Sequence, residues 1–219
     1  MQTDVKIQAD NVQLAGELAL PADHRGIVLF IHGTGSTRFS QRNQFVAKKL
    51  GSAGLGTLLF ELLTAEESAL DLRSPNLARF DIPLLARRLV GVTQWLKSQP
   101  NVGDTALGYY GASTGGGVVM AAAAQMGKGI SAVVSRGGYV DQAGKALPDV
   151  TAPTLMIVGS LDQQILWLNQ DAYRKMKCVR RLEVVDGAHH LFEEAGKLEE
   201  VTRLASDWFK RYFSPSPAP

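Results

Sequence analysis

The sequence has little cysteine, no long apolar run and no large excess of charge of either sign, and each shortage excludes a class of protein. Cys178 is the single cysteine among 219 residues, so the chain forms no internal disulfide and fits a reducing cytoplasm. No apolar run reaches membrane-spanning length, and the first ten residues, MQTDVKIQAD, do not form a signal peptide. The net charge is +2 and the basic residues are scattered, which argues against a nucleic-acid surface. We therefore expect a cytoplasmic protein with neither a membrane nor a nucleic-acid partner.

Several ligand-binding motifs are missing as well. The sequence contains no C-x-x-C pair and no H-E-x-x-H, so we predict no metal site. It also has no G-x-G-x-x-G after the first strand and no G-x-x-x-x-G-K, which disfavours a nucleotide-binding module and leads us to predict no cofactor. With 45% hydrophobic and 20% charged residues, the composition is that of an ordinary globular protein. We expect one domain over residues 1–213 and a disordered tail, SPSPAP, over residues 214–219.

Hydrophobic patterning predicts strands that alternate with helices along most of the chain. Strands are expected at residues 3–8, 11–20, 26–31, 56–61, 105–112, 130–135, 154–159 and 180–185. Helices are expected at residues 41–53, 81–98, 139–146, 165–176 and 195–212, and one directly after Ser113. Residues 62–80 lack a clear period and predict a loop beside the site, with room for a short helix. This alternation indicates a mainly parallel, twisted sheet of about eight strands with helices on both faces, which binds ligands beyond the carboxyl ends of its strands.

The stretch TALGYYGASTGGG, residues 105–117, organises the chain. It predicts a buried strand, a turn with glycine on both sides of Ser113, and the start of an alanine-rich helix. Gly111 and Gly115 complete the pattern G-x-S-x-G, in which a strand turns at once into a helix. Such a turn strains the serine backbone and leaves room for only small residues two positions away. It also pushes the serine hydroxyl out at the edge of the sheet, so Ser113 is a candidate nucleophile.

Two further polar groups follow predicted strands at the same edge. Asp162 comes just after the strand at 154–159, and the pair His189-His190 comes after the strand at 180–185. A serine hydroxyl becomes a good nucleophile when an imidazole takes its proton, and a buried carboxylate fixes the tautomer of that imidazole. Asp162 also precedes a helix, and a role as its N-cap is compatible with catalysis. Because neighbouring side chains point in different directions, we expect one of the two histidines to face Ser113.

Acyl chemistry at Ser113 needs two N–H donors aimed at the carbonyl oxygen of the substrate. One is expected to be the backbone N–H of Thr114, which directly follows the nucleophile. The other is expected from the polar loop that begins at His32, with Thr34 as the best candidate. His32 itself is expected to hold that loop in place.

Four segments, IHGTGS, GASTG, GSLD and GAHHLFEEAGKLEEV, occur in this order over nearly the whole chain. Together they resemble the α/β-hydrolase superfamily and, within it, the dienelactone-hydrolase-like branch in small single-domain form. The resemblance implies an α/β-hydrolase fold with the triad order Ser113, Asp162, His190, since in that branch the histidine before Leu-Phe is the base. One departure is that dienelactone hydrolases carry a cysteine at the elbow. With Ser113 in that place, the dienelactone substrate is not carried over.

The remaining candidates have two interpretations each. Arg136 ends a strand at the same edge and could bind an anionic substrate group through its guanidinium, although an internal ion pair with Glu61 or Asp81 is favoured. Trp167 and Phe192 could line an acyl pocket or pack in the core.

The expected function is that of a serine hydrolase that cleaves small carboxylic esters or lactones through an acyl-enzyme. Acyl transfer to peroxide or an alcohol uses the same triad and stays an alternative, as does a non-catalytic binding protein. Residues 136–153 join two strands over too short a distance for a cap domain. An uncapped site predicts faster turnover of short acyl esters than of long ones. The sequence carries no signal for the oligomeric state.

Overall fold

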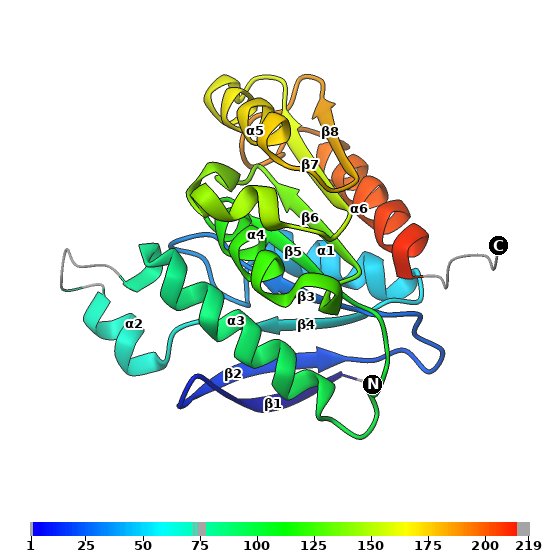
Figure 1. The fold of residues 1–219 in the computed structure, drawn as a ribbon. Coiled ribbons are helices and arrows are strands. Elements are labelled where there is room, and N and C mark those ends of the chain that lie inside the picture. Colours follow the sequence, from blue (N-terminus) through cyan, green and yellow to red (C-terminus); the bar gives the residue numbers. More distant parts are fainter. Residues whose placement is uncertain (1, 72, 74–77, 214–219) are drawn as a thin grey trace.

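The computed structural model describes residues 2–71, 73 and 78–213, which form a three-layer α/β domain around one sheet (Figure 1). The strands are β1 (Gln2–Ala9), β2 (Val12–Ala19), β3 (Ile27–Ile31), β4 (Gly56–Phe60), β5 (Leu107–Ala112), β6 (Ala132–Arg136), β7 (Thr154–Gly159) and β8 (Arg180–Val185). They lie in the order β1-β2-β4-β3-β5-β6-β7-β8. The β1–β2 and β2–β4 pairs are antiparallel, whereas all pairs from β4 to β8 are parallel. The eight-stranded, mainly parallel sheet expected from the sequence is confirmed.

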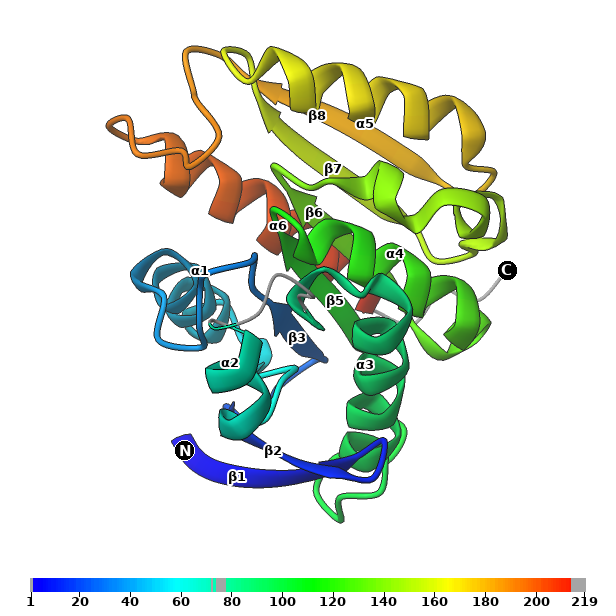
Figure 2. The same ribbon diagram turned by 90° about the vertical axis from the view of Figure 1, so that its left-hand side faces the viewer.

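Helices cover both faces of the sheet. The α-helices are α1 (Gln41–Ser52), α2 (Ala65–Asp71), α3 (Ile82–Lys97), α4 (Gly115–Met126), α5 (Gln163–Lys175) and α6 (Lys197–Phe213). Three 3₁₀ segments are η1 (Ala78–Phe80), η2 (Gly127–Gly129) and η3 (Val140–Asp149). Figure 2 shows α1 and α6 on one side of the sheet and α3 and α4 on the other. None of the helices in the described ranges is long and apolar enough to cross a membrane.

The pattern of each strand follows from how many of its faces are covered. Every residue of β3, β4, β5 and β7 is buried, which explains their nearly continuous apolar sequences. In β5 the neighbours Tyr109 and Tyr110 point to opposite faces and join different core clusters. The first cluster lies under α3 and α4, and the second lies under α1 and α6. The sheet is therefore the layer between two separate apolar cores.

Local signals account for where the helices begin. The Asp81 carboxylate accepts the Leu84 N–H at 2.9 Å and so caps α3, and Pro83 occupies the first turn, where a missing N–H costs nothing. The helix expected at 139–146 is instead the 3₁₀ stretch η3. Gly144 within it has a φ of +53°, and Pro148 has no backbone N–H to donate. These two residues prevent a continuous α-helix there.

The chain between β6 and β7 is filled by η3, so no cap domain is inserted at this point. The segment expected as a loop or short helix at 62–80 contains α2 and η1 in its described part. The predicted disordered tail, 214–219, lies outside the described residues. At the carboxyl ends of β3, β5, β7 and β8 the chain therefore enters short loops, which hold the polar residues singled out in the sequence.

Candidate active site

Ser113 lies in the tight turn between β5 and α4. Its φ of +54° is in the left-handed region, which a non-glycine residue adopts only at a cost of about 1–3 kcal/mol. A Cβ at Gly111 would lie 2.5 Å from the Gly115 carbonyl oxygen, and a Cβ at Gly115 would lie 2.4 Å from the Ile31 carbonyl oxygen. Both glycines are therefore required by close backbone approach. The Ser113 N–H donates to the Arg136 carbonyl at 3.1 Å, which fixes the turn to β6.

A row of hydrogen bonds joins Ser113, His190 and Asp162. His190 Nε2 lies 3.2 Å from Ser113 Oγ, and His190 Nδ1 lies 2.6 Å from Asp162 Oδ2. A carboxylate only accepts, so Nδ1 carries the proton and Nε2 is left to accept the serine proton. Asp162 is the N-cap residue of α5 but makes no capping hydrogen bond with its side chain. Its carboxylate is directed to the histidine instead of the helix.

The two adjacent histidines have different surroundings. His189 Nδ1 lies 2.6 Å from Glu194 Oε1, and the side chain is 68% exposed. The ring of His190 points inward, 6.1 Å from the ring of Tyr139. Phe192, two residues later, adopts a φ of +57° and is buried, so the loop turns sharply after the histidines. The structure thus brings His190 and not His189 to Ser113.

The loop after β3 packs directly against the nucleophile. A Cβ at Gly33 would lie 2.8 Å from the Cβ of Ser113, so only glycine allows this approach. The next residue, Thr34, donates its backbone N–H to Thr114 Oγ1 at 2.8 Å. The two predicted oxyanion residues are therefore neighbours beside Ser113. Their role as donors to a substrate stays a prediction.

His32 ties the same loop to the end of β4. Its Nε2 donates to Glu61 Oε2 at 2.9 Å, and Glu61 Oε1 accepts the Arg38 N–H at 2.8 Å. Burial raises the pKa of Glu61, but the hydrogen bonds and the charges of His32 and Arg38 together outweigh it, so this pKa lies below its usual value. The carboxylate is therefore ionised and holds both ends of the loop. This contact agrees with the loop-holding role expected for His32.

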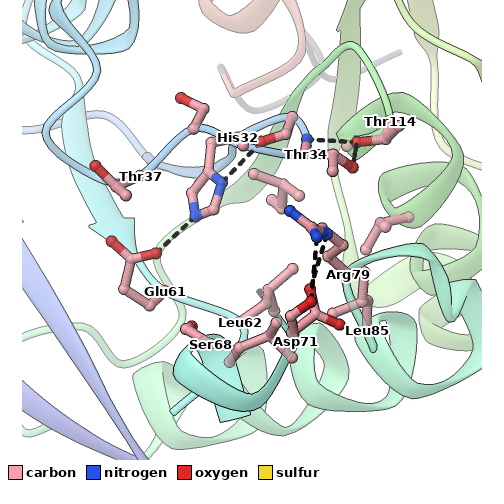
Figure 3. A pocket seen from close by; sticks show the side chains of 17 residues that line it. His32, Thr34, Thr37, Glu61, Leu62, Ser68, Asp71, Arg79, Leu85 and Thr114 are labelled. Atoms are coloured by element: carbon pink, nitrogen blue, oxygen red, sulfur yellow. Dashed lines mark hydrogen bonds and ion pairs between the residues drawn. The ribbon is translucent and has the colours of Figure 1, made fainter. Parts of the chain in front are cut away.

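A cavity of about 250 Å³ lies beside Thr34 and Thr114 (Figure 3). Its wall includes the apolar side chains of Leu62 from the loop after β4, Leu85 from α3 and Val118 from α4. The charged groups of the wall are paired with one another. They are the His32–Glu61 pair and the Arg79–Asp71 pair, in which Nε lies 2.8 Å from Oδ2.

The ion pair expected for Arg136 needs correction, whereas the core interpretation of Phe192 is confirmed. Arg136 is 6% exposed and its guanidinium lies 6.0 Å from the ring centre of Phe192, itself a core residue at 1% exposure. The expected ion pair with Glu61 or Asp81 is wrong, because the described structure shows Glu61 bound to His32, and Asp81 capping α3. Neither Arg136 nor Phe192 lines the cavity.

Trp167 also lies outside the cavity wall. It is on α5 and 61% exposed, so packing in the core does not explain it either. The amphipathic pattern of α5 carried no information about which exposed aromatic residues face a ligand.

Sequence reasoning missed three residues near the site. Asp71 and Arg79 line the cavity, yet they come from the segment without a hydrophobic period, so no pattern marked them. Tyr139, beside His190, follows β6 by three positions and donates its backbone N–H to the Ser113 carbonyl at 3.0 Å. Its place just beyond a strand end was a signal that could have identified it.

Comparisons with known proteins agree with this fold. The model of the Dienelactone hydrolase family matches residues 14–214. The chain belongs to this family. A crystal structure of a dienelactone hydrolase from Anabaena variabilis superposes with a TM-score of 0.94 at 49% identity, covering 97% of this chain and 98% of that one. Membership of this family and the superposition give the chain an α/β-hydrolase fold and support an enzyme of the hydrolase type.

More distant structures share the fold alone. Est1E from Butyrivibrio proteoclasticus has a TM-score of 0.79 at 17% identity, covering 97% of this chain and 99% of that one. A relative in sequence is a protein of Mycobacterium tuberculosis named "Putative phosphoribosyl transferase", which is 51% identical over 207 residues. The match covers 94% of this chain but 45% of that protein. This member of the dienelactone hydrolase family thus spans about half the length of the curated relatives it matches.

Proposed function

We propose that the protein is a serine hydrolase that cleaves small carboxylic esters or lactones through an acyl-enzyme. The observation that carries the proposal is the continuous row of hydrogen bonds from Ser113 through His190 to Asp162. The partners of each ring nitrogen support this assignment, because a carboxylate that accepts at Nδ1 leaves Nε2, the nitrogen nearest the serine, to accept a proton. The strained backbone of Ser113 holds its hydroxyl at the open edge of the sheet.

In the proposed reaction, Ser113 Oγ attacks the carbonyl carbon of the ester while His190 Nε2 takes the hydroxyl proton. Asp162 stabilises the resulting imidazolium, and the oxygen that becomes negative is held by the backbone N–H groups of Thr114 and Thr34. The tetrahedral intermediate expels the alcohol, which receives the proton from His190. Water, activated by the same histidine, then releases the acid from the acyl-enzyme and restores Ser113.

The cavity supports a small, uncharged acyl group. Its volume of about 250 Å³ lies just below the usual range for ligand pockets. The basic side chains that reach it, Arg79 and His32, already have the carboxylate partners Asp71 and Glu61. An anionic substrate would therefore have to compete with a partner that is in place. We accordingly propose neutral esters or lactones in preference to substrates that carry a carboxylate.

Two other functions are less well supported by the site. Acyl transfer to an alcohol or peroxide uses the same acyl-enzyme, and differs only in which acceptor reaches it. Phosphoribosyl transfer appears in the name of the M. tuberculosis relative, but this chain matches 45% of that protein. The name can therefore refer to the part that has no counterpart here.

An activity-based probe tests the proposal. A fluorophosphonate reacts covalently with a serine only when its hydroxyl is activated, so it is expected to label the wild-type protein at Ser113, located by peptide mass spectrometry. Prior heat denaturation should abolish the labelling. Neutral p-nitrophenyl esters of two to six acyl carbons are the matching substrates. A protein that is labelled nowhere and hydrolyses none of these esters would refute a serine hydrolase and leave a binding protein of the same fold.

A further inference from the structure

The side chain of Thr114 makes an unusual pair of contacts. Its Oγ1 accepts the backbone N–H of Thr34 at 2.8 Å and also lies 2.8 Å from Thr34 Oγ1 (Figure 3). One oxygen is thus held between two polar atoms of a single residue, 80 positions away in the chain. Both threonines are only partly buried, so a bound substrate can reach them.

The usual role of a threonine at this position is absent. Thr114 occupies the N-cap of α4, where a hydroxyl ordinarily accepts a backbone N–H from the first turn of the helix. The Thr114 side chain makes no capping hydrogen bond. Its hydroxyl is directed away from its own helix to the loop after β3. Helix capping therefore does not explain it.

The hydroxyl oxygen of Thr114 also lies at the distance from the Thr34 nitrogen that a bound substrate oxygen would have. Donors of an oxyanion hole lie about 2.7–3.1 Å from the oxygen that they stabilise. Thr114 Oγ1 sits at this distance from the Thr34 nitrogen. An N–H group has a single proton, so it cannot point at Thr114 and at a substrate oxygen with full strength at the same time. Binding of a carbonyl oxygen at this donor requires the hydroxyl to give way.

We propose that Thr114 is a positioning residue for the oxyanion site, an inference that rests on the proposed hydrolase function. In the free enzyme its hydroxyl accepts a hydrogen bond from the Thr34 N–H and so keeps that N–H oriented. When substrate binds, the carbonyl oxygen replaces the hydroxyl as the acceptor. The bond between the two hydroxyls keeps the Thr114 side chain anchored when it yields. No covalent bond changes in this exchange.

The surroundings explain why such a contact is needed. Gly35 and Thr37, on the same loop, are exposed, and Gly35 has a φ of +76°. Glu61 holds the two ends of the loop, and the Thr34 N–H between them is oriented by Thr114. Thr114 supplies this partner from the start of α4. The substrate then replaces an existing hydrogen bond to an N–H that is already oriented, which lowers the entropy cost of the transition state.

Amide hydrogen exchange tests the hydrogen bond without using activity. We expect the Thr34 amide, followed by NMR, to exchange about tenfold faster in Thr114→Val than in the wild type, the effect of losing one neutral hydrogen bond. Thr114→Ser keeps the hydroxyl and should keep the protection. Equal exchange in the valine variant and the wild type would overturn the proposal.

Kinetics test the catalytic consequence. Thr114→Val should lower kcat for a short p-nitrophenyl ester about tenfold with little change in KM, whereas Thr114→Ser should stay within about threefold of the wild type. Thr151→Val, at an exposed loop position, is the matched control for a threonine-to-valine change. Thermal unfolding of each variant, which does not depend on the oxyanion site, confirms that it is folded.

The outcomes separate the two proposals. If the wild type hydrolyses esters and Thr114→Val keeps its full kcat, or Thr114→Ser is as impaired as the valine variant, the positioning role is refuted while the hydrolase stands. If the wild type hydrolyses no ester, the hydrolase function fails, and with it the positioning of a substrate oxygen. The exchange result then shows whether the threonine contact has a structural role alone.

Discussion

The row of Ser113, His190 and Asp162 and the cavity beside it are positioned by different parts of the fold. Ser113, Asp162 and His190 each follow the end of a parallel strand, and the sheet itself fixes the distances between them. The cavity beside them depends on α2 and η1, which supply Asp71 and Arg79 and pack outside the sheet. In the proposed hydrolase the reacting residues lie at strand ends of the sheet, and substrate selection falls to the short elements α2 and η1 outside it. Substitutions of Ser113, Asp162 or His190 should therefore stop the reaction, and substitutions in the cavity wall should change which substrate is preferred.

Replacement of the nucleophile gives the largest expected effect. Ser113→Ala should lower kcat for ester hydrolysis on the order of 10³-fold or more, leaving only the background of the oxyanion site. Ser52→Ala, at an exposed position on α1, is the matched control. Full activity in Ser113→Ala, measured at equal concentrations of folded protein, would show that another residue attacks the substrate.

The histidine pair tests whether the geometry identifies the base. His190→Ala should be nearly as damaging as loss of Ser113, because the serine proton then has no acceptor. His189→Ala removes an exposed ring bonded to Glu194 and should retain most of the activity. Matched kcat/KM values for the two variants decide the matter, and the reverse ranking would contradict the arrangement described here.

A change in the cavity should alter selectivity more than rate. Leu85 lines the cavity and Leu89, one turn later on α3, does not, although both are buried. Leu85→Ala should raise kcat/KM for hexanoate relative to acetate about tenfold, since roughly three methylene groups gain burial, partly offset by cavity hydration. Leu89→Ala should cost similar stability, about 2–5 kcal/mol, and leave the ratio unchanged. An unchanged ratio in both variants would place the acyl group elsewhere.

The smallest effect is expected where α2 is attached to α3. Arg88, which is buried, donates to both carboxylate oxygens of Glu67 on α2. These hydrogen bonds hold the pKa of Glu67 below its ordinary value of 4.5. The stabilisation is therefore present above pH 4.5 and is lost as the pH falls through the lower pKa of the folded state.

Glu67→Gln should consequently lower the melting temperature by a few degrees at pH 7, and the difference from the wild type should shrink in acid. Thermal unfolding of both proteins between pH 7 and pH 3 measures this. A gap that widens in acid would mean that Glu67 does not stabilise the fold through its charge.

The same contrast explains how much the sequence could predict. Motifs at strand ends are local, so the turn at Ser113 and the positions of Asp162 and His190 could be read from spacing and flanking residues. The parallel sheet followed from continuous apolar runs, since a strand covered on both faces has no polar side. The resemblance to a family then favoured one of two adjacent histidines.

The cavity could not be predicted in this way. It depends on pairs such as Arg79 with Asp71, which form only after the chain has folded. The prediction for Arg136 failed for a different reason. A charged residue at a strand end suggested an ion pair or a ligand, but its side chain is buried near Phe192, which belongs to the core cluster under α1 and α6. Spacing gives the edge at which a residue lies but not the direction of its side chain.

The pairing of β3 with β5 has a consequence for how the protein folds. It aligns Ile27 with Leu107 and Ile31 with Gly111, so the two central strands come together only after a loop of about 80 residues has closed. Contacts between distant parts of a chain form slowly, because the entropy of loop closure must be overcome first. The loop that bears Thr34 and the turn that bears Ser113 extend from these same two strands. The proposed reactive centre therefore depends on the most non-local strand pairing of the sheet, and recovery of ester hydrolysis during refolding would report completion of the central sheet.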